Sequence, residues 1–167
     1  MRSAKSPNKQ LQRTVIRRRG RVARWELDID PVLTAACYAL YVIDKPCNCT
    51  DCQNFRAAGD QAFPPPFREL ASRLGVDLTK PSELCHYGQA GQPCPTGGWF
   101  HLVGTLLSGR DAWRQIDEKT WHGDTEPDCG LSGLGFTSRI ALLPDAFNGH
   151  PVVQLEFQTT VPWVLGE

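Results

Sequence analysis

The sequence predicts an α+β domain of about five mostly antiparallel strands, with two short helices inserted between the second and third strands. Three observations support this fold class. Several segments alternate apolar and polar residues with the period of two that is typical of half-buried strands. Two short segments have a helical cap or helical spacing. The length of 167 residues suits a single domain, and no internal repeat is visible.

The first two strands are expected near the start of the domain. In residues 24–30, Trp25, Leu27 and Ile29 alternate with charged side chains, and Pro31 ends the segment. The apolar run TAACYALYVI follows at residues 34–43. The Tyr, Val and Ile residues at the end of this run favour a buried strand over a short helix.

Two helices are expected next. Thr50 and Gln53 have the spacing of a capping box, which predicts a helix over residues 51–58 that ends at Gly59. The prolines of FPPP, residues 63–66, form a stiff connector, and the last proline can begin the second helix. That helix ends at Gly75. Its apolar residues recur at i, i+3, i+4 and i+7 and are Phe67, Leu70, Ala71 and Leu74.

Three strands are expected in the second half of the chain. Residues 98–107 are mostly apolar on both faces, which predicts a central strand. Residues 134–143 and 151–160 predict two more, and the last should show one face to water because polar residues alternate with Val153, Leu155 and Phe157. Turn-rich residues 80–98 and the long polar segment 108–133 connect these strands, with one helical turn near 111–116. GLSGLGF, at 130–136, predicts a flexible turn.

Charge is distributed unevenly along the chain. The first 24 residues hold nine of the eighteen Lys and Arg residues and no acidic residue, so the remainder carries nine basic and eighteen acidic side chains. We expect a disordered basic tail over residues 1–23 and a single α+β domain over residues 24–167. The acidic body argues against nucleic-acid binding outside the tail. No apolar stretch suits a secretory signal or a membrane span, so we expect a cytoplasmic protein without membrane contact.

Three cysteines lie close together in KPCNCTDCQNF, residues 45–55. Cys47, Cys49 and Cys52 have the spacing Cys-x-Cys-x-x-Cys. Thiolates bind Zn²⁺ tetrahedrally, and this spacing can turn several sulfur atoms toward one ion, so we expect a structural zinc site. Three cysteines leave one coordination position of the tetrahedral ion for a fourth ligand. The sequence does not rank the candidates well; they are Cys37, Cys85, His86, Cys94 and Cys129.

Two other interpretations of these cysteines stay open. Cys49 and Cys52 form a Cys-x-x-Cys pair at a predicted helix N-terminus, where the helix dipole favours the thiolate, as a thiol redox enzyme or sensor requires. The neighbouring charge of Asp51 opposes this, and the surroundings lack the βαβ pattern of thioredoxin-like proteins. The three thiols can also be small apolar side chains in or near the core.

Motifs of hydrolases and of dinucleotide-binding proteins are absent from the sequence. His101 lies in an apolar strand, which favours a hydrogen-bonded core histidine over a catalytic base. Nothing in the sequence brings it to Cys49 or Cys52 to activate a nucleophile. A ligand pocket in the long polar segment is the alternative to a solvated loop pinned by one tryptophan. Its candidate residues are Trp121, His122, Asp124 and Glu126.

Four stretches together carry a resemblance that covers roughly residues 25–165. They are KPCNCTDCQNF, FPPPFRELASRLGVDLTKPSE, GGWFHLVG and LEFQTTVPWVL. With them the chain resembles a family of small bacterial proteins without an assigned function, which share a Cys-x-Cys-x-x-Cys-x-Asn-Phe run and a Gly-Gly-Trp-Phe-His segment. The N-terminal SPNKQLQRT resembles reading frames that begin inside the recombination site of a mobile gene cassette. The resemblance implies as family features Cys47, Cys49, Cys52, Asn54, Trp99 and His101.

The sequence therefore favours a non-enzymatic cytoplasmic domain that recognises a protein or a small ligand. Its loop with Cys47, Cys49 and Cys52 is expected to hold a structural metal, with zinc as the cofactor. The rival hypothesis is a thiol redox enzyme or sensor that uses Cys49 and Cys52. Whether another Cys or His donor atom lies within bonding reach of the three thiols is the observation that best separates the hypotheses.

Overall fold

A computed structural model describes residues 18–166, which form nine strands, three α-helices and two 3-10 helices. The strands are β1 (Arg18–Val22), β2 (Trp25–Ile29), β3 (Glu83–His86), β4 (Cys94–Ser108), β5 (Trp113–Gln115), β6 (Trp121–Gly123), β7 (Glu126–Asp128), β8 (Leu131–Thr137) and β9 (Val152–Val161). The helices are α1 (Pro31–Leu40), α2 (Thr50–Ala58), η1 (Gly59–Ala62), α3 (Pro65–Leu74) and η2 (Asp145–Phe147). The α+β class is confirmed, but the predicted five strands and two helices are too few.

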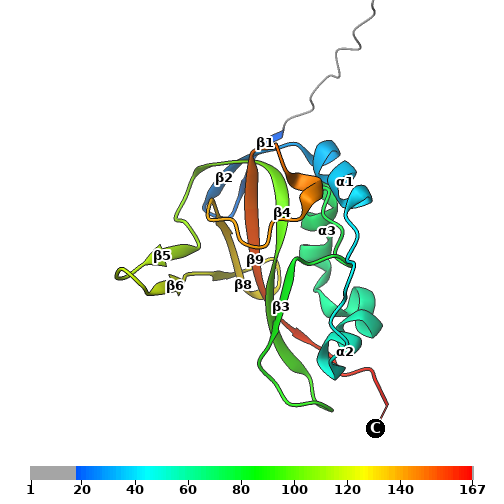
Figure 1. Cartoon of the computed structure of the whole chain (residues 1–167). Coiled ribbons are helices and arrows are strands. Elements are labelled where there is room, and N and C mark those ends of the chain that lie inside the picture. Colours follow the sequence, from blue (N-terminus) through cyan, green and yellow to red (C-terminus); the bar gives the residue numbers. More distant parts are fainter. Residues whose placement is uncertain (1–17, 167) are drawn as a thin grey trace, which may run out of the picture.

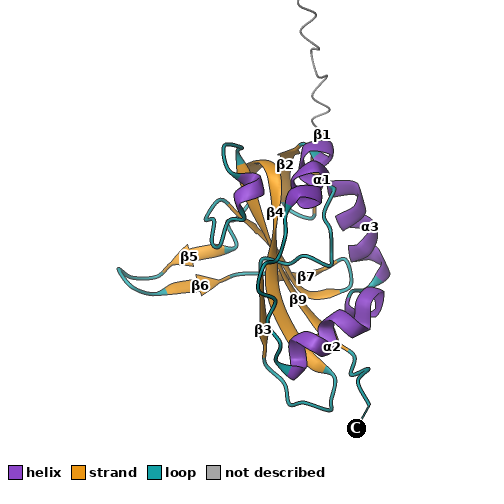
Figure 2. Ribbon diagram, turned by 45° about the vertical axis from the view of Figure 1, so that its right-hand side comes forward, coloured by secondary structure: helices purple, strands orange, loops and turns teal. Residues whose placement is uncertain are grey.

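Seven strands form one antiparallel sheet in the order β1-β2-β4-β9-β8-β7, with β3 paired to β4. The predicted central strand is confirmed as part of β4, which pairs with β9 along one edge and with β2 and β3 along the other. Strands β5 and β6 form a separate hairpin that projects from the body of the molecule (Figure 1). All three α-helices follow β2 and precede β3, and they lie along one side of the sheet (Figure 2).

The core lies between the sheet and these helices. Phe63 and Phe67, from the connector and α3, pack against Phe157 of β9 with ring centroids 5.1 and 6.4 Å away. Phe63 also contacts Phe100 of β4, at 6.0 Å. Such aromatic pairs add to the free energy of burying their area. They hold α3 and the preceding connector, and hence α2, against the sheet. No helix in the described part of the chain is long and apolar enough to cross a membrane.

The strand predicted at residues 34–43 is wrong, because most of this segment belongs to helix α1. The helix has a strong start that the apolar run obscures. Asp30 is its N-cap, with a carboxylate oxygen that accepts a hydrogen bond from the Leu33 N–H at 2.9 Å. Pro31 occupies the first turn, where the missing N–H costs nothing.

Contacts between α1 and the edge of β4 explain why this segment is a helix and not a strand. Between the parts of this edge that pair with β3 and β2, the backbone of two residues forms hydrogen bonds with helix side chains instead of with a strand. The Tyr38 hydroxyl donates to the His101 carbonyl at 3.2 Å and accepts from the His101 N–H at 3.1 Å. The Thr34 hydroxyl accepts from the Val103 N–H at 3.0 Å. Thr34 and Tyr38 are four residues apart and so share one helix face.

Tyr38→Phe is expected to lower the free energy of unfolding by about 2 kcal/mol, because the buried N–H and C=O of His101 would both lose their partner. The ring should keep its contact with Phe147, whose centroid lies 5.2 Å away. Chemical denaturation followed by fluorescence measures the change. The half-buried Tyr41 is the matched control, and Tyr41→Phe should cost less than about 0.5 kcal/mol. Equal stabilities of the two variants would contradict this role for the Tyr38 hydroxyl.

Several other expectations change. Part of the tail predicted to be disordered, residues 18–22, forms β1 and pairs with β2, while residues 1–17 lie outside the described residues. Strand β3 lies within the predicted turn-rich connection, and β5 replaces the predicted helical turn near 111–116. The predicted turn at 130–136 is mostly β8, and the strand predicted over 134–143 ends at Thr137.

The outer face of β9 is open to water at one end only. The prediction is right for Gln158 and Thr160, which are exposed, and wrong for Gln154 and Glu156. Gln154 and Glu156 are 2% and 7% exposed. The loop after β8 covers Gln154, whose side-chain oxygen accepts a hydrogen bond from the Ala141 N–H at 2.8 Å. At the base of the β5–β6 hairpin, Trp113 covers Glu156. Alternation identified the strand correctly, but exposure of its polar face depends on segments that fold over it later.

Candidate metal centre

The three cysteines of the predicted metal site meet at the N-terminus of α2. Their Sγ atoms all lie within 4.8 Å of one another. Cys47 and Cys49 are exposed, whereas Cys52 is buried in the first turn of the helix. The Arg56 guanidinium, one turn further along, donates to the Cys47 carbonyl at 2.8 Å and so holds the loop against the helix. The structure thus brings the predicted group together.

The start of α2 differs by one residue from the predicted capping box. Cys49, not Thr50, is the N-cap, and its sulfur accepts a hydrogen bond from the Cys52 N–H at 3.5 Å. Gln53 donates from its side chain to the Asn48 carbonyl at 2.7 Å instead of reaching the cap N–H. A helix N-terminus favours negative charge, which suits a thiolate at the cap.

An imidazole from β3 adjoins the three sulfur atoms. His86 Nε2 lies 3.4 Å from Cys52 Sγ. Tetrahedral bonds of about 2.3 Å to sulfur and 2.0–2.1 Å to nitrogen would put two such donor atoms about 3.5 Å apart. The donor atoms that all lie within 4.8 Å of one another are the three sulfur atoms alone. His86 lies next to this group, on the side of Cys52. A shared ion therefore requires a small movement of the imidazole or of the exposed Cys47 and Cys49.

Thr96 orients the His86 ring. Its hydroxyl lies 3.0 Å from His86 Nδ1 and donates to the Cys94 carbonyl at 3.2 Å. Because the hydroxyl proton of Thr96 is directed at the carbonyl, the hydroxyl oxygen accepts a hydrogen bond from the Nδ1–H of His86. The other ring nitrogen, Nε2, therefore carries no proton and directs its lone pair toward Cys52. Metal-binding histidines are commonly held in this way. Burial lowers the pKa of His86, although the Asp51 carboxylate opposes this, and the neutral imidazole is the form that binds metal.

The three thiols differ in acidity. Burial raises the pKa of Cys52 to about 12, and Cys49 and Cys47 add to the effect. The pKa of Cys47 is lowered, chiefly because the Cys49 N–H donates to its sulfur. A metal ion would remove the cost of ionising Cys52, since a coordinating thiol loses its proton. For a redox couple, the exposed Cys47 is a better thiolate than Cys52. All seven cysteines are free thiols in this structure.

A cavity of about 340 Å³ lies beside the cysteines. Cys47, Cys49, Cys52 and His86 form one part of its lining. Tyr41 and Thr79 contribute to the remainder, from the end of α1 and from the loop after α3. The three-sulfur group is thus open to a space large enough for a small ligand.

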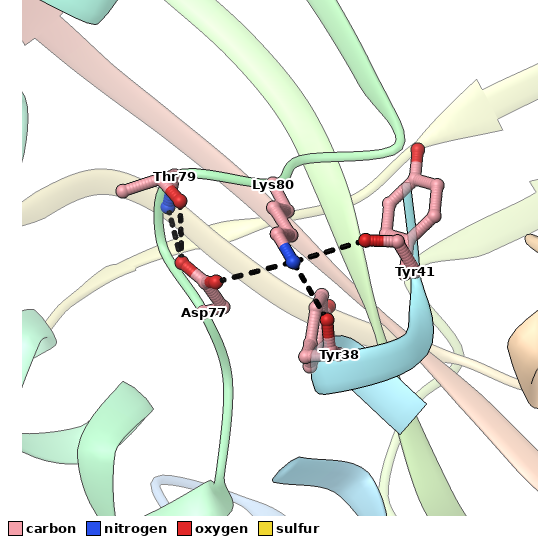
Figure 3. Close-up of polar contacts among 5 residues, drawn as sticks. All are labelled: Tyr38, Tyr41, Asp77, Thr79 and Lys80. Carbon is pink, nitrogen blue, oxygen red and sulfur yellow. Dashed lines mark hydrogen bonds and ion pairs between the residues drawn. The ribbon is translucent and has the colours of Figure 1, made fainter. Parts of the chain in front are cut away.

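Lys80 fixes the wall of this cavity that Tyr41 and Thr79 form (Figure 3). Its ammonium group donates to the carbonyls of Tyr38 and Tyr41 at 2.7 and 2.9 Å, at the end of α1. Asp77 lies 3.8 Å from the same nitrogen and accepts from both the N–H and the hydroxyl of Thr79. The lysine thus satisfies carbonyls that the end of a helix leaves without partners.

Lys80→Met is expected to lower the free energy of unfolding by about 1–2 kcal/mol, because the methionine keeps the apolar stem but cannot donate to the two carbonyls. Denaturant titration measures the change. Lys119, in the exposed turn between β5 and β6, is the control, and Lys119→Met should leave stability within about 0.5 kcal/mol of the parent. A Lys80 variant as stable as this control would show that water replaces the ammonium group.

The other candidate fourth ligands lie elsewhere. Cys37 and Cys94 are 3% and 2% exposed, in α1 and at the start of β4. Cys85 neighbours His86 on β3, and Cys129 lies in the turn between β7 and β8. None of these four belongs to the mutually close donor group of the described residues. His86 was one of five unranked candidates because its proximity to Cys52 depends on how β3 packs on α2.

His101 is a buried core histidine, as its strand pattern favoured. It is fully buried, its Nδ1 lies 2.8 Å from the Ser82 hydroxyl, and its ring lies 5.9 Å from that of Phe147. The imidazole beside Cys52 is that of His86, not that of His101. A pairing of His101 with Cys49 or Cys52, for which the sequence offered no support, finds no contact in the structure either.

Burial lowers the pKa of His101 to about 4, so stability should depend on pH. The unfolded chain takes up the proton near pH 6.5 and the folded chain only near pH 4, so the folded state loses stability as pH falls between these values. We expect a loss of about 3 kcal/mol across this window, measured by denaturation at each pH. His101→Asn should flatten the dependence of the free energy of unfolding on pH, whereas His150→Asn, at an exposed position, should not. An unchanged slope in His101→Asn would contradict the assignment.

The predicted ligand pocket of the polar segment is only partly formed. Trp121 lines a small cavity with Trp99 and Trp113. Asp124 instead pairs with Arg110, Glu126 pairs with Arg24 at 3.0 Å, and His122 is exposed on β6. The sequence offered no signal for Trp99 and Trp113 as neighbours of Trp121, since the three lie on different strands.

Asn54, which the resemblance singled out, ties the C-terminal segment to α2. Its amide donates to the Pro162 carbonyl at 2.9 Å and accepts from the Val164 N–H at 2.8 Å. A scan against protein-family models and searches of curated proteins and of solved structures find no match to this chain. The resemblance to small bacterial proteins stays a prediction, and the inferences that follow depend on the geometry of the chain itself.

Proposed function

We propose that Cys47, Cys49, Cys52 and His86 hold one structural Zn²⁺ in a non-enzymatic domain that recognises a protein or a small ligand. The observation that carries the proposal is the meeting of three sulfur atoms within 4.8 Å, with an oriented imidazole nitrogen 3.4 Å from one of them. Three thiolates and a neutral imidazole form one of the usual sets of ligands in structural zinc sites. A reducing compartment such as the cytoplasm would keep the thiols available.

The structural role follows from which segments the ion would join. Cys47 lies in the loop after α1, Cys52 in the first turn of α2, and His86 at the end of β3. Cys52 and His86 are 34 residues apart in the chain. Four protein ligands fill a tetrahedron and leave no position for substrate, which favours stabilisation over catalysis. The ion would thus tie the loop and α2 to the edge of the sheet.

The recognition role is supported by the adjoining cavity of about 340 Å³, which is within the usual size range of small-molecule sites. Apolar walls come from Ile43, Phe55 and Leu84. The charged lining residues are the basic Lys45 and Arg56 and the acidic Glu83, so basic charge is in excess. This combination suits a ligand with an apolar body and an acidic group. A metal that fixes the loop would also fix one wall of the cavity.

Metal analysis of protein purified without chelator tests the proposal. We expect about one equivalent of zinc, and loss of most of it in Cys52→Ser and in His86→Gln. Cys85→Ser is the matched control, because it removes a neighbouring thiol outside the donor group and should retain zinc. Protein without metal that shows a reversible two-electron oxidation of Cys47, Cys49 or Cys52 would overturn the proposal in favour of the redox alternative.

A further inference from the structure

Three tryptophans converge at the base of the β5–β6 hairpin and form what we call the tryptophan cage. Trp99 comes from β4, Trp113 from β5 and Trp121 from β6. The cage encloses about 190 Å³, and its other lining residues are Arg139, Ala141 and Gln154. Trp99 precedes Phe100, whose ring packs against Phe63 in the core. Since successive strand residues face opposite sides, the cage lies on the sheet face opposite the helices.

Three of the six residues that line the cage are tryptophans. The indole N–H of Trp99 donates to the Ala141 carbonyl at 3.1 Å, and that of Trp113 donates to the Glu156 carboxylate at 2.8 Å. Two of the three indole donors are therefore already engaged within the protein. A ligand recognised here gains little from hydrogen bonds and more from contact with the rings, whose faces carry partial negative charge.

A buried acid lies next to the cage. Glu156 is the cross-strand partner of Trp99 and is 7% exposed. The hydrogen bonds from Gln154 and Trp113 both reach its Oε1. Burial raises the pKa of Glu156, and the nearby carboxylate of Asp111 adds to the effect. No ion pair to Glu156 forms within residues 18–166. A cation in the cage would supply the missing countercharge.

One ring of the cage already carries a cation. The guanidinium carbon of Arg139 lies 3.6 Å from the centroid of Trp121, within the range of a cation–π contact. Arg139 belongs to the irregular segment after β8 and is exposed. Its side chain can therefore leave the ring without disturbing buried structure.

We propose that the tryptophan cage binds a quaternary ammonium group, such as a choline head group or a trimethylated lysine side chain, in exchange for Arg139. The cavity volume equals that of about six water molecules, which admits a trimethylammonium group but not a drug-sized ligand. A quaternary ammonium has no N–H donors, so it loses no hydrogen bonds when it enters a cage lined by tryptophans.

Nuclear magnetic resonance of the full chain tests this site with choline as the probe. The indole N–H signals of Trp99, Trp113 and Trp121 should shift saturably, and those of Trp25 and Trp163 should not. The neutral isostere 3,3-dimethyl-1-butanol should bind about tenfold more weakly, because it keeps the shape and loses the charge. Equal binding of the two compounds, or no binding of choline at 50 mM or so, would overturn the proposal.

Three variants separate the parts of the site. Trp121→Leu should abolish binding, while Trp163→Leu, which alters a tryptophan outside the cage, should not. Glu156→Gln should weaken choline binding about tenfold, since it removes the charge and keeps the size. Arg139→Gln changes an exposed residue and should tighten binding several-fold. Weaker binding in Arg139→Gln, with a preference for a planar ring such as adenine, would instead identify an Arg139–Trp121 clamp and overturn the proposal.

Discussion

Removal of zinc is expected to lower the melting temperature of this protein by about 10 °C, the largest effect that the proposed metal centre predicts. Without the ion, the loop with Cys47 and Cys49, the start of α2 and the end of β3 lose their common attachment. A loss of about 3 kcal/mol corresponds to roughly 6–12 °C for a domain of this size. The remaining core should keep the fold, so the effect is smaller than in zinc fingers, which unfold without metal.

Differential scanning calorimetry before and after dialysis against a chelator measures this shift, and readdition of zinc should restore the original melting temperature. Cys52→Ser should melt at the temperature of the metal-free parent and show no further response to chelator. Cys85→Ser should respond as the parent does. A metal-loaded parent whose melting temperature is insensitive to chelator would show that the ion, if bound, does not stabilise the fold.

The second large effect concerns Gly98, where the backbone of β3 lies close to that of β4. A Cβ atom at this position would lie 2.1 Å from the Glu83 carbonyl oxygen and 3.0 Å from the Phe157 ring. Since the oxygen belongs to the backbone of β3, Gly98→Ala must push that strand away. We expect a loss of about 3 kcal/mol in the free energy of unfolding. Because His86 ends the displaced strand, the variant should also retain less zinc.

Gly97 provides the matched control for this prediction. A Cβ atom there would meet its nearest neighbour, the Phe157 carbonyl oxygen, at 3.4 Å, which is close to an ordinary contact. Gly97→Ala should therefore cost less than about 1 kcal/mol and retain zinc. Denaturant titration and metal analysis of the two variants test both parts. Equal stability and equal zinc content would show that β3 can shift without consequence for the metal centre.

The two segments that carry the resemblance contribute to several parts of the structure. In the Cys-x-x-Cys-x-Asn-Phe part, Cys52 contacts His86, Asn54 holds the C-terminal segment, and Phe55 packs in the core. In Gly-Gly-Trp-Phe-His, Trp99 lines the cage and His101 hydrogen-bonds Ser82. The motif therefore combines residues of the candidate sites with residues that the fold itself needs, so its presence alone does not identify a function.

The sequence by itself determined the features that depend on local chemistry. The alternation of apolar and polar residues located β2 and β9. The helical spacing of apolar residues, together with Gly75, located α3. Three cysteines within six residues identified the candidate metal group. Such features are decided by backbone preferences and by the burial of one face, which neighbouring residues already specify.

Only the tertiary structure decided the features that join distant segments. It made residues 34–40 a helix, because Thr34 and Tyr38 hydrogen-bond backbone groups of β4, more than 60 residues later, that no strand pairs. It brought His86, one of five candidate fourth ligands, beside Cys52, and it gathered three tryptophans near a buried Glu156. The physical reason is that a hydrogen bond or a metal–ligand bond needs a partner within a few ångströms. A local sequence pattern does not specify which distant segment supplies that partner.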